Sequence, residues 1–348
     1  MRILQVVPRY PPRTGGVETH VREVAERLVD RGHDVTVATA DAGADVSTAE
    51  TRNGVSVRRH RGVAPGGAFH VAPGVVRSVR NVDADVVHAH NYHSLPLLFA
   101  ALAVDDERFV ATTHYHGASA SAIRDRLLTI YRTLGRRALG RADAVVAVGD
   151  HERDLLRGDF GVDATVVPNG IDVGRFRGAA PRERDRPYLL TVGRLEEYKG
   201  VQHVVRALPE LPEYDLLVAG SGPYADEIRA AAAEAGVADR VELLGYVPDE
   251  ELPGLYAGAD AYATMSSFEA FGLSVGEALA AGTPCAVLAE GALVDWTDRP
   301  DCVGASDAEP ETIAAAIREA ATRTPDPTTL PTWDGAVDDL ERLYRPSE

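Results

Sequence analysis

Short apolar runs alternate with longer stretches of helical periodicity through the first half of the chain. The runs Arg2–Val7, Asp34–Thr39 and Asp85–His90 have the length of strands, and Glu18–Arg31 has the length and spacing of a helix. The runs are short enough for strands buried on both faces of a sheet. This alternation predicts βαβ units and a parallel sheet, with further strands at Phe109–Thr113, Ala144–Val148 and Thr165–Val167.

A second series of the same kind begins after Val167-Pro168-Asn169-Gly170, where Pro and Asn-Gly interrupt regular structure. The fold class is therefore α/β, with two doubly wound, Rossmann-like sheets facing each other across a cleft. Ligands of such sheets bind beyond the carboxyl ends of the strands, so the cleft is the expected site. The strands of the second series are predicted at Tyr188–Val192, Asp215–Ala219, Val241–Leu244, Ala261–Ala263 and Cys285–Leu288.

The chain is expected to form two domains and a closing helix. The first domain covers residues 1–167 and the second covers residues 168–330. Residues 322–331 are rich in Thr and Pro and lack periodicity, as in a linking segment. The last part, residues 331–348, is expected to supply a helix near 335–344 that packs back on the first domain.

Charge narrows the class of partner. The 348 residues carry a formal net charge of −17, which disfavours nucleic acid as a ligand. A dispersed acidic excess of this kind resembles proteins of halophiles, in which salt screens self-repulsion. Lys199 is the only lysine, the other basic residues being arginine. A single lysine kept in such a chain suggests a site that needs a point charge, with chance as the alternative.

Cysteine usage and hydropathy favour a cytoplasmic protein. Cys285 and Cys302 are the only cysteines and have no metal-site spacing, so we expect buried, reduced side chains. The apolar run after Met1 stops at Pro8 and is too short for a signal peptide. No segment has the length and apolar character of a membrane span, although contact with a membrane surface stays open.

Two glutamates flank a glycine at the predicted start of a helix. Glu269-Ala270-Phe271-Gly272-Leu273 precedes a helix that runs to Ala281 and carries Glu277. Amide groups at Gly272, Leu273 and Ser274 would point at an anion such as a phosphate. Glu277 could accept hydrogen bonds from the hydroxyls of a ribose, and Glu269 from a sugar. Alternatively, the two carboxylates only complement the helix dipole.

Two cations stand five residues apart in the loop Val192–Gly200. Arg194 and Lys199 could hold a diphosphate there and neutralise it as a leaving group. A solvated turn is the alternative.

Near the N-terminus, Gly15-Gly16 follows the first strand and would allow close backbone approach to a phosphate or sugar. This pair is not the GxGxxG fingerprint of a dehydrogenase.

Together these segments resemble glycosyltransferase family 4, whose members are retaining enzymes of the GT-B fold. The resemblance runs from the N-terminal Gly-Gly loop to at least Pro284. It is specific only as a combination of motifs. These are Gly15–Glu18, Asp85–His90, Thr113-His114, Val167–Asp172, the Arg194 and Lys199 loop, Gly220–Pro223, and the pair Glu269 and Glu277.

The resemblance implies roles for individual residues. Arg194 and Lys199 would bind the donor diphosphate and take part in catalysis with Glu269, which would hold the transferred sugar. His114 would face that sugar from the opposite domain. The rest of the nucleotide sugar would be bound by Gly16, by the base-contacting Gly245, Tyr246 and Val247, by Phe271, Gly272 and Leu273, and by Glu277 at the ribose. The family implies retention of anomeric configuration and no cofactor or metal for the chemistry.

Four features are interpreted as structural or divergent. Asp83-Ala84-Asp85 imitates a DxD metal motif but precedes a buried strand, and His88 with His90 lacks an obvious third ligand, so no metal site is expected. Gly276 stands where the family commonly has a larger apolar residue. The segment Glu290–Trp296 replaces a glycine-rich stretch of the family, and it is expected to differ in packing or specificity.

An arginine-rich stretch between residues 123 and 141 interrupts the acidic chain. Six arginines accompany apolar residues at roughly helical spacing. One hypothesis is a helix that docks on anionic lipid to reach a lipid-linked acceptor. A solvated helix packed on its domain explains the pattern equally well.

The leading hypothesis is a retaining transfer from a nucleotide diphosphate sugar to a glycan or lipid-linked acceptor. A nucleotide-sugar epimerase of the same fold is an alternative. A phosphorylase would need a second lysine for pyridoxal phosphate, which the chain lacks. A catalytically silent binding scaffold is the alternative from a different class.

Overall fold

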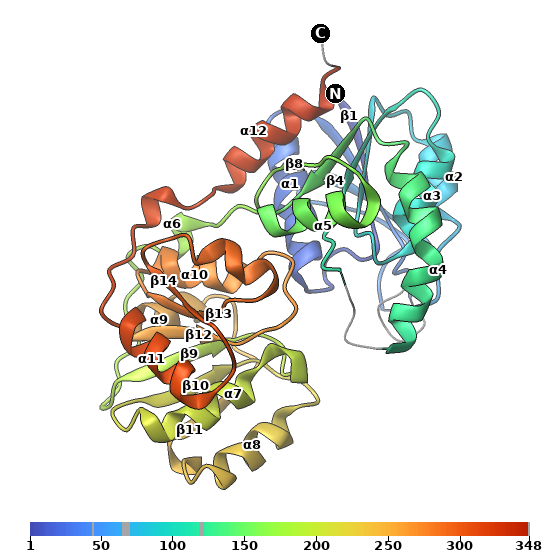
Figure 1. Cartoon of the computed structure of the whole chain (residues 1–348). Coiled ribbons are helices and arrows are strands. Elements are labelled where there is room, and N and C mark those ends of the chain that lie inside the picture. Colours follow the sequence, from blue (N-terminus) through green and yellow to red (C-terminus); the bar gives the residue numbers. More distant parts are fainter. Residues whose placement is uncertain (44, 65–69, 118–121, 347–348) are drawn as a thin grey trace. The chain divides into compact units, whose positions relative to one another are not determined.

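The computed structural model describes the chain except for residues 44, 65–69, 118–121 and 347–348, and it describes 122–130 by backbone alone. The described chain divides into two compact units. Unit 1 comprises Met1–Gly170 and Trp333–Glu348, and unit 2 comprises Ile171–Thr332. The sequence analysis expected these limits at 167/168 and 330/331. Each unit is an α/β structure around its own sheet (Figure 1).

Unit 1 is built on a sheet with strand order β3-β4-β2-β1-β5-β6-β7-β8. The strands pair parallel except for β3 with β4. Strand order reverses between β1 and β5, the switch point of a doubly wound fold. The strands are β1 (Arg2–Val7), β2 (Asp34–Thr39), β3 (Ala49–Arg52), β4 (Val55–Arg59), β5 (Val86–His90), β6 (Arg108–Thr112), β7 (Ala144–Ala147) and β8 (Thr165–Val166).

Helices cover this sheet, and their apolar faces form its core with the strands. Valines, leucines and alanines of β1, β5 and β6 are buried together with side chains of the neighbouring helices. The helices of unit 1 are α1 (Gly16–Asp30), α2 (Val75–Asn81), α3 (Leu95–Ala103), α4 (Ala122–Leu139), α5 (Asp150–Phe160) and α12 (Trp333–Tyr344).

The hairpin of β3 and β4 is absent from the sequence prediction. Its two-residue turn holds Asn53 at φ 47° and Gly54 at φ 81°. These left-handed residues are typical of a type I′ turn, which suits hairpins because its twist matches that of the strands. β3 is polar, and β4 carries only two buried valines, Val55 and Val57, so the Asn-Gly pair was the clearest signal.

Unit 2 has strand order β11-β10-β9-β12-β13-β14, with every described pair parallel. In order of appearance this is 3-2-1-4-5-6, the doubly wound order, and its switch point lies between β9 and β12. Of these strands, β14 is the one that the sequence pattern does not predict. The strands are β9 (Tyr188–Val192), β10 (Asp215–Ala219), β11 (Val241–Gly245), β12 (Ala261–Thr264), β13 (Cys285–Leu288) and β14 (Cys302–Ala305).

The helices of unit 2 include several short 3₁₀ segments. Cys285 and Cys302 are buried free thiols on neighbouring strands, as the sequence predicted. The helices are α6 (Val173–Phe176), η2 (Glu197–Lys199), α7 (Val201–Ala207), η3 (Leu208–Glu210), α8 (Ala225–Glu234), η4 (Ala238–Arg240), α9 (Leu252–Gly258), α10 (Leu273–Ala281), η5 (Gly291–Trp296), α11 (Pro310–Ala320) and η6 (Pro327–Thr329).

The last helix, α12, packs against α1 and so completes unit 1 (Figure 1). Arg31 at the end of α1 donates to Asp338 at 2.6 Å and to Glu341 at 3.0 Å. Tyr344 is buried, and its hydroxyl lies 2.7 Å from Nδ1 of His88 on β5. The C-terminal segment therefore supplies part of the core of unit 1.

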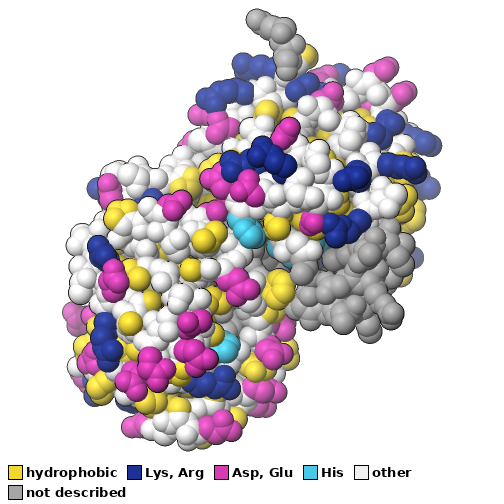
Figure 2. Space-filling model, in the orientation of Figure 1, with side chains coloured by type: hydrophobic (Ala, Val, Ile, Leu, Met, Phe, Trp, Pro, Cys, Tyr) yellow, Lys and Arg dark blue, Asp and Glu magenta, His cyan; other side chains and the backbone are white. Residues whose placement is uncertain are grey.

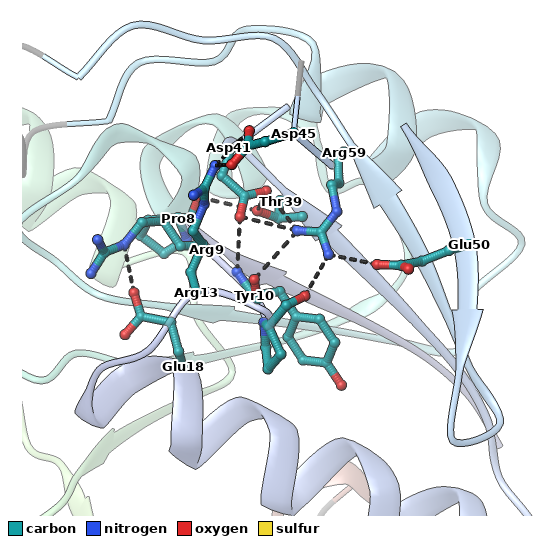
Figure 3. A network of polar contacts seen from close by, with 11 residues as sticks. Pro8, Arg9, Tyr10, Arg13, Glu18, Thr39, Asp41, Asp45, Glu50 and Arg59 are labelled. Atoms are coloured by element: carbon teal, nitrogen blue, oxygen red, sulfur yellow. Dashed lines mark hydrogen bonds and ion pairs between the residues drawn. The ribbon is translucent and has the colours of Figure 1, made fainter. Parts of the chain in front are cut away.

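A buried arginine ties the edge of this sheet to the loop that follows β1 (Figure 3). The Arg59 side chain is fully buried. Its guanidinium lies 2.9 Å from Asp41, 2.7 Å from Glu50 and 2.6 Å from the carbonyl oxygen of Pro11. A buried charge is stable only when paired in this way. The network thus fixes the loop that leads into Gly15.

Candidate functional site

The switch point of unit 2 brings together two loops that the sequence analysis singled out. Residues 193–200 follow β9, and residues 265–272 follow the neighbouring β12. Both loops leave the carboxyl ends of adjacent strands, where doubly wound sheets bind their ligands. We call them the switch-point loops.

Glycines let these loops approach each other closely. Gly200 has φ 69°, and a Cβ there would lie 2.0 Å from the carbonyl oxygen of Met265. A Cβ at Gly220 would lie 1.8 Å from the carbonyl oxygen of Gly193. Contacts this short exclude any side chain, so glycine is required at both positions.

Three charged residues of the switch-point loops, Arg194, Lys199 and Glu269, are connected by short contacts. Lys199 Nζ donates to Glu269 Oε1 at 2.6 Å, and both side chains are about one-fifth exposed. Arg194 Nη2 donates to the Tyr198 hydroxyl at 3.3 Å. The amide of Ser267 donates to the carbonyl oxygen of Tyr198 at 2.9 Å, which joins the two loops. A lysine, an arginine and a carboxylate therefore lie on two loops that are joined by a backbone hydrogen bond.

The N-terminus of α10 directly follows this cluster. Gly272 precedes the helix with φ 88°. Trp296 Nε1 donates to the carbonyl oxygen of Phe271 at 2.5 Å, and the two rings pack edge to face. The divergent segment Gly291–Trp296 thus supports the loop before α10. The sequence marks that segment as divergent but does not indicate its contact with Phe271.

This support yields a test. Replacing Trp296 by phenylalanine removes the indole N–H and leaves the Phe271 carbonyl without its donor. We expect a loss of about 1–2 kcal/mol in the free energy of unfolding. We also expect a severalfold higher KM for the substrate bound at this loop, with kcat nearly unchanged. Denaturant unfolding and substrate titrations measure both. Val294→Ala, a half-exposed position on the same segment, serves as control; an unchanged KM in Trp296→Phe would contradict this role.

Glu277 lies on α10 and accepts a hydrogen bond from the Tyr256 hydroxyl at 2.9 Å. Burial raises the pKa of Glu277 to about 7, against the opposing effect of that hydrogen bond. Tyr256, which the sequence analysis did not consider, is fully buried and orients the carboxyl group. The neighbouring Gly276 has a simple explanation, because a Cβ there would lie 2.3 Å from Ile171 Cδ1. Ile171 fills the space that a larger residue would need.

The expected base-contacting residues lie at the end of β11, with Gly245 as its last residue and Tyr246 and Val247 directly after it. The carbonyl oxygen of Gly245 accepts from the amide of Gly220 at 2.7 Å. Tyr246 is 74% exposed, and Val247 packs against the core of unit 2. Since Gly220 also contacts Gly193, these residues are linked through backbone to the first switch-point loop.

In unit 1, Gly16 begins α1. A Cβ at Gly16 would meet no atom within 4 Å, whereas one at Gly15 would lie 2.3 Å from Glu18 Oε2. A side chain at position 15 would therefore displace the Glu18 carboxylate, which pairs with Arg9. At Gly16 the backbone stays open for approach by another molecule.

His114 follows β6 in a left-handed conformation, with φ 46°. Its two neighbours are held by one buried carboxylate. Glu152 accepts from the Thr113 hydroxyl and from the amides of Tyr115, at 2.5 Å, and Val148, at 2.6 Å. Burial raises the pKa of Glu152 to about 7, and these donors oppose the shift. Glu152 therefore positions His114, a role that no sequence motif indicated.

Histidines crowd the core around His114. His88 Nε2 lies 2.7 Å from the Thr112 hydroxyl, and His90 Nε2 lies 2.5 Å from Gln5 Oε1. The ring of His20, from α1, lies 5.3 Å from that of His90 and 5.0 Å from that of His114. No sequence pattern predicted that His20 belongs to this group.

These histidines determine how unit 1 responds to acid. Burial lowers the pKa of His20 to about 4 and the pKa values of His88, His90, His93 and His114 well below the usual range. Below about pH 6.5 the unfolded chain binds protons that the folded unit does not. The free energy of unfolding of unit 1 therefore decreases as the pH is lowered. Glu152, with a raised pKa, acts in the opposite direction between about pH 4.5 and 7, but it is one group against five.

We therefore expect the melting temperature of unit 1 to fall as pH is lowered from 7 to 5. His20 alone contributes about 2 kcal/mol over that interval. Calorimetry at constant salt measures the change. A melting temperature that is constant or rises towards pH 5 would contradict this assignment of charge states.

The Asp83-Ala84-Asp85 triplet is accounted for locally. Arg2 pairs with Asp83 and lies 2.5 Å from Asp85. The hydrogen bond from the Arg2 side chain lowers the pKa of Asp85 to about 2. Both carboxylates thus bind the first strand, as the sequence interpretation held.

Two protein families match this chain, and the matched ranges meet close to the boundary between units 1 and 2. The family described as "Glycosyltransferase Family 4" matches residues 14–175, and the family "Glycosyl transferases group 1" matches residues 173–325. A GDP-mannose-dependent α-(1-6)-phosphatidylinositol monomannoside mannosyltransferase of Mycolicibacterium smegmatis is 33% identical over 291 residues, 78% of this chain and 75% of the relative. A glycogen synthase of Mycobacterium tuberculosis is 32% identical over 322 residues, covering 82% and 77%.

Solved structures agree in fold. Sucrose-phosphate synthase from Thermosynechococcus elongatus superposes with a TM-score of 0.76 at 21% identity, covering 99% of this chain and 98% of that one. Anabaena HepE in complex with UDP and glucose gives 0.77 at 18% identity, covering 98% of each chain. The protein is thus a glycosyltransferase of the GT-B fold. It belongs to glycosyltransferase family 4 and depends on a nucleotide-sugar donor.

Proposed function

We propose that this enzyme transfers a hexosyl group from a nucleotide diphosphate sugar with retention of anomeric configuration. The observation that carries the proposal is the cluster of Lys199, Arg194 and Glu269 at the switch point of unit 2. Lys199 and Arg194 are assigned to the donor diphosphate and Glu269 to the transferred sugar. Glu277 is assigned to the ribose, and Gly245, Tyr246 and Val247 to the base.

The chemistry requires a charge-stabilised leaving group. The bond between the anomeric carbon and the diphosphate oxygen breaks, and the electron pair leaves with the diphosphate. Lys199, Arg194 and the amides at the start of α10 stabilise that charge. The acceptor hydroxyl attacks the same face, and its proton passes to the departing phosphate oxygen. His114 of unit 1 is proposed to contact the sugar, and Gly16 a phosphate or the acceptor. These groups supply the stabilisation without a metal or cofactor.

GDP-mannose is the donor we propose first, because the mycobacterial relative at 33% identity is GDP-mannose-dependent. A thermal-shift and hydrolysis screen against GDP-, UDP- and ADP-sugars tests the choice. Glu277→Ala should abolish stabilisation by the preferred donor, since it removes the ribose acceptor, whereas Glu234→Ala on the exposed face of α8 should not. If no nucleotide sugar stabilises the folded protein, the result would favour the alternative of a catalytically silent binding scaffold.

The acceptor is proposed to be a glycan or a lipid-linked molecule, and α4 offers a membrane contact. Arg132, Arg136 and Arg137 are exposed, while Leu134 among them is 46% exposed. Arg124 and Arg126 belong to the same sequence pattern, but their side chains lie outside the described residues. Cationic side chains around an exposed leucine fit an anionic lipid surface.

Vesicle flotation tests this contact. Binding to anionic vesicles, and not to neutral ones, should be lost when Arg132, Arg136 and Arg137 are changed to glutamine. A control variant neutralises exposed arginines elsewhere, at Arg157, Arg229 and Arg342. Binding that is equal in the two variants, or absent in the parent protein, would limit α4 to packing.

We propose a saline cytoplasm as the compartment. Among the residues that the structure describes, no helix combines the length and apolar character that a membrane crossing requires. On the face drawn in Figure 2 acidic side chains are spread over the surface rather than gathered in one patch. At low ionic strength these acidic side chains repel one another. The melting temperature should therefore rise as the KCl concentration is increased. A melting temperature independent of KCl would argue against halophilic adaptation.

A further inference from the structure

Three buried histidines of unit 1 converge from separate elements. His20 comes from α1, His90 from the end of β5, and His114 from the segment after β6. Their exposed fractions are 1%, 0% and 4%. One ring nitrogen from each histidine lies within 4.8 Å of those from the other two. Only the fold brings these residues together, because they are 70 and 24 positions apart.

Hydrogen bonds fix which nitrogens of two rings are available. His20 Nδ1 lies 2.7 Å from Asn169 Oδ1, and His90 Nε2 lies 2.5 Å from Gln5 Oε1. Amide oxygens only accept, so each of these ring nitrogens carries the proton. Gln5 Nε2 donates to the Tyr344 hydroxyl, which supports the amide orientation. The opposite nitrogens, His20 Nε2 and His90 Nδ1, therefore present lone pairs.

Three ring nitrogens at this place have no hydrogen-bond partner in the part of the chain that the structure describes. His20 Nε2, His90 Nδ1 and His114 Nε2 are buried atoms without a hydrogen-bond partner among the described residues. An unsatisfied buried polar atom costs about 1–3 kcal/mol, so three at one place call for a ligand. The left-handed backbone at His114 holds its ring at the cluster despite the strain of that conformation.

We propose that this chain binds one divalent first-row transition-metal cation through His20, His90 and His114. Neutral imidazoles suit Zn²⁺, Co²⁺, Ni²⁺ and Cu²⁺, whereas Ca²⁺ and Mg²⁺ prefer oxygen ligands. Three histidines with an open fourth position are an established zinc arrangement in other proteins. Asn169 and Gln5 accept from the remaining N–H groups of His20 and His90, as the outer partners of metal-bound histidines do.

Burial favours binding in one further respect. It lowers the pKa of all three imidazoles below the usual histidine range, so the ligands are neutral at pH 7 and a cation displaces no proton. Binding does not depend on the proposed transfer chemistry. If His114 also contacts the donor sugar, the bound cation excludes that contact and inhibits transfer.

The test is titration of Co²⁺ into chelator-treated, untagged full-length protein in molar KCl. We expect visible absorption bands of low-symmetry Co²⁺ that saturate at one equivalent and disappear when Zn²⁺ is added. His20→Gln should weaken Co²⁺ binding at least about tenfold. His203→Gln, a histidine replaced in unit 2, is the matched control and should bind as the parent does.

Folding is checked by circular dichroism, and His90→Gln replaces His20→Gln if the latter does not fold. Absence of Co²⁺ bands in the parent protein would overturn the proposal and leave a shared buried water as the partner of the three nitrogens. Unchanged binding in every folded variant of the three histidines would overturn it as well, because the cation would then lie elsewhere.

Discussion

Replacing Lys199 by alanine is expected to lower kcat for sugar transfer by about 10²–10³-fold, the usual cost of removing one group that stabilises developing negative charge. Lys199 is the only ammonium in the side chains, and it lies 2.6 Å from Glu269 at the switch point. The variant also leaves Glu269 without this partner. Steady-state kinetics with the preferred donor measures the effect.

Two companions sharpen this test. Lys199→Arg keeps the charge but changes its shape, so it should recover only part of the rate. Arg229→Ala removes an exposed cation on α8 and should leave the rate unchanged. A rate in Lys199→Ala within threefold of the parent would remove the lysine from the chemistry and weaken the assignment of the whole cluster.

Replacing Arg59 by methionine should destabilise unit 1 by about 3–5 kcal/mol, the range for breaking a buried ion pair from one side. Methionine keeps an apolar side chain at this position. The Asp41 carboxylate, which is 4% exposed, loses its cationic partner and remains next to Glu50. The substitution also frees the loop after β1 (Figure 3). Denaturant or thermal unfolding measures the loss.

The neighbouring Arg58→Met is the control, because Arg58 is exposed on the same strand and should cost less than about 0.5 kcal/mol. Adding Asp41→Asn and Glu50→Gln to Arg59→Met should restore part of the stability, since the stranded charges are then removed. Equal losses at positions 58 and 59 would show that burial of the charge is not what stabilises the loop.

Sequence patterns predicted the elements whose signal is local. Strands β1, β9, β10 and β13 begin and end at the predicted residues, and α10 ends at Ala281 as predicted. The hairpin β3–β4 was missed because β3 is polar and β4 has only two buried valines, Val55 and Val57. The strand β14 (Cys302–Ala305) was missed because it is short, and its pairing with β13 gives it structure that its own composition does not indicate.

The candidate site divides in the same way. Lys199 and Glu269 are in loops with recognisable motifs, so they could be named from the sequence, and the structure brings them into contact. Glu152, Trp296 and His20 have no such motif. Each acts through a partner at least 25 positions away, and only the three-dimensional fold determines that partner.

The discontinuity of unit 1 has a consequence for the order of folding during synthesis. Unit 2 is one continuous segment, so its core can form as soon as residues 171–332 have left the ribosome. Unit 1 waits for α12, because Tyr344 supplies the hydroxyl that His88 contacts and Glu341 pairs with Arg31. The first unit to be translated is therefore the last to be completed, and a ribosome that stops before residue 333 releases a chain in which His88 lacks Tyr344 and His20 lacks the ring of Trp333.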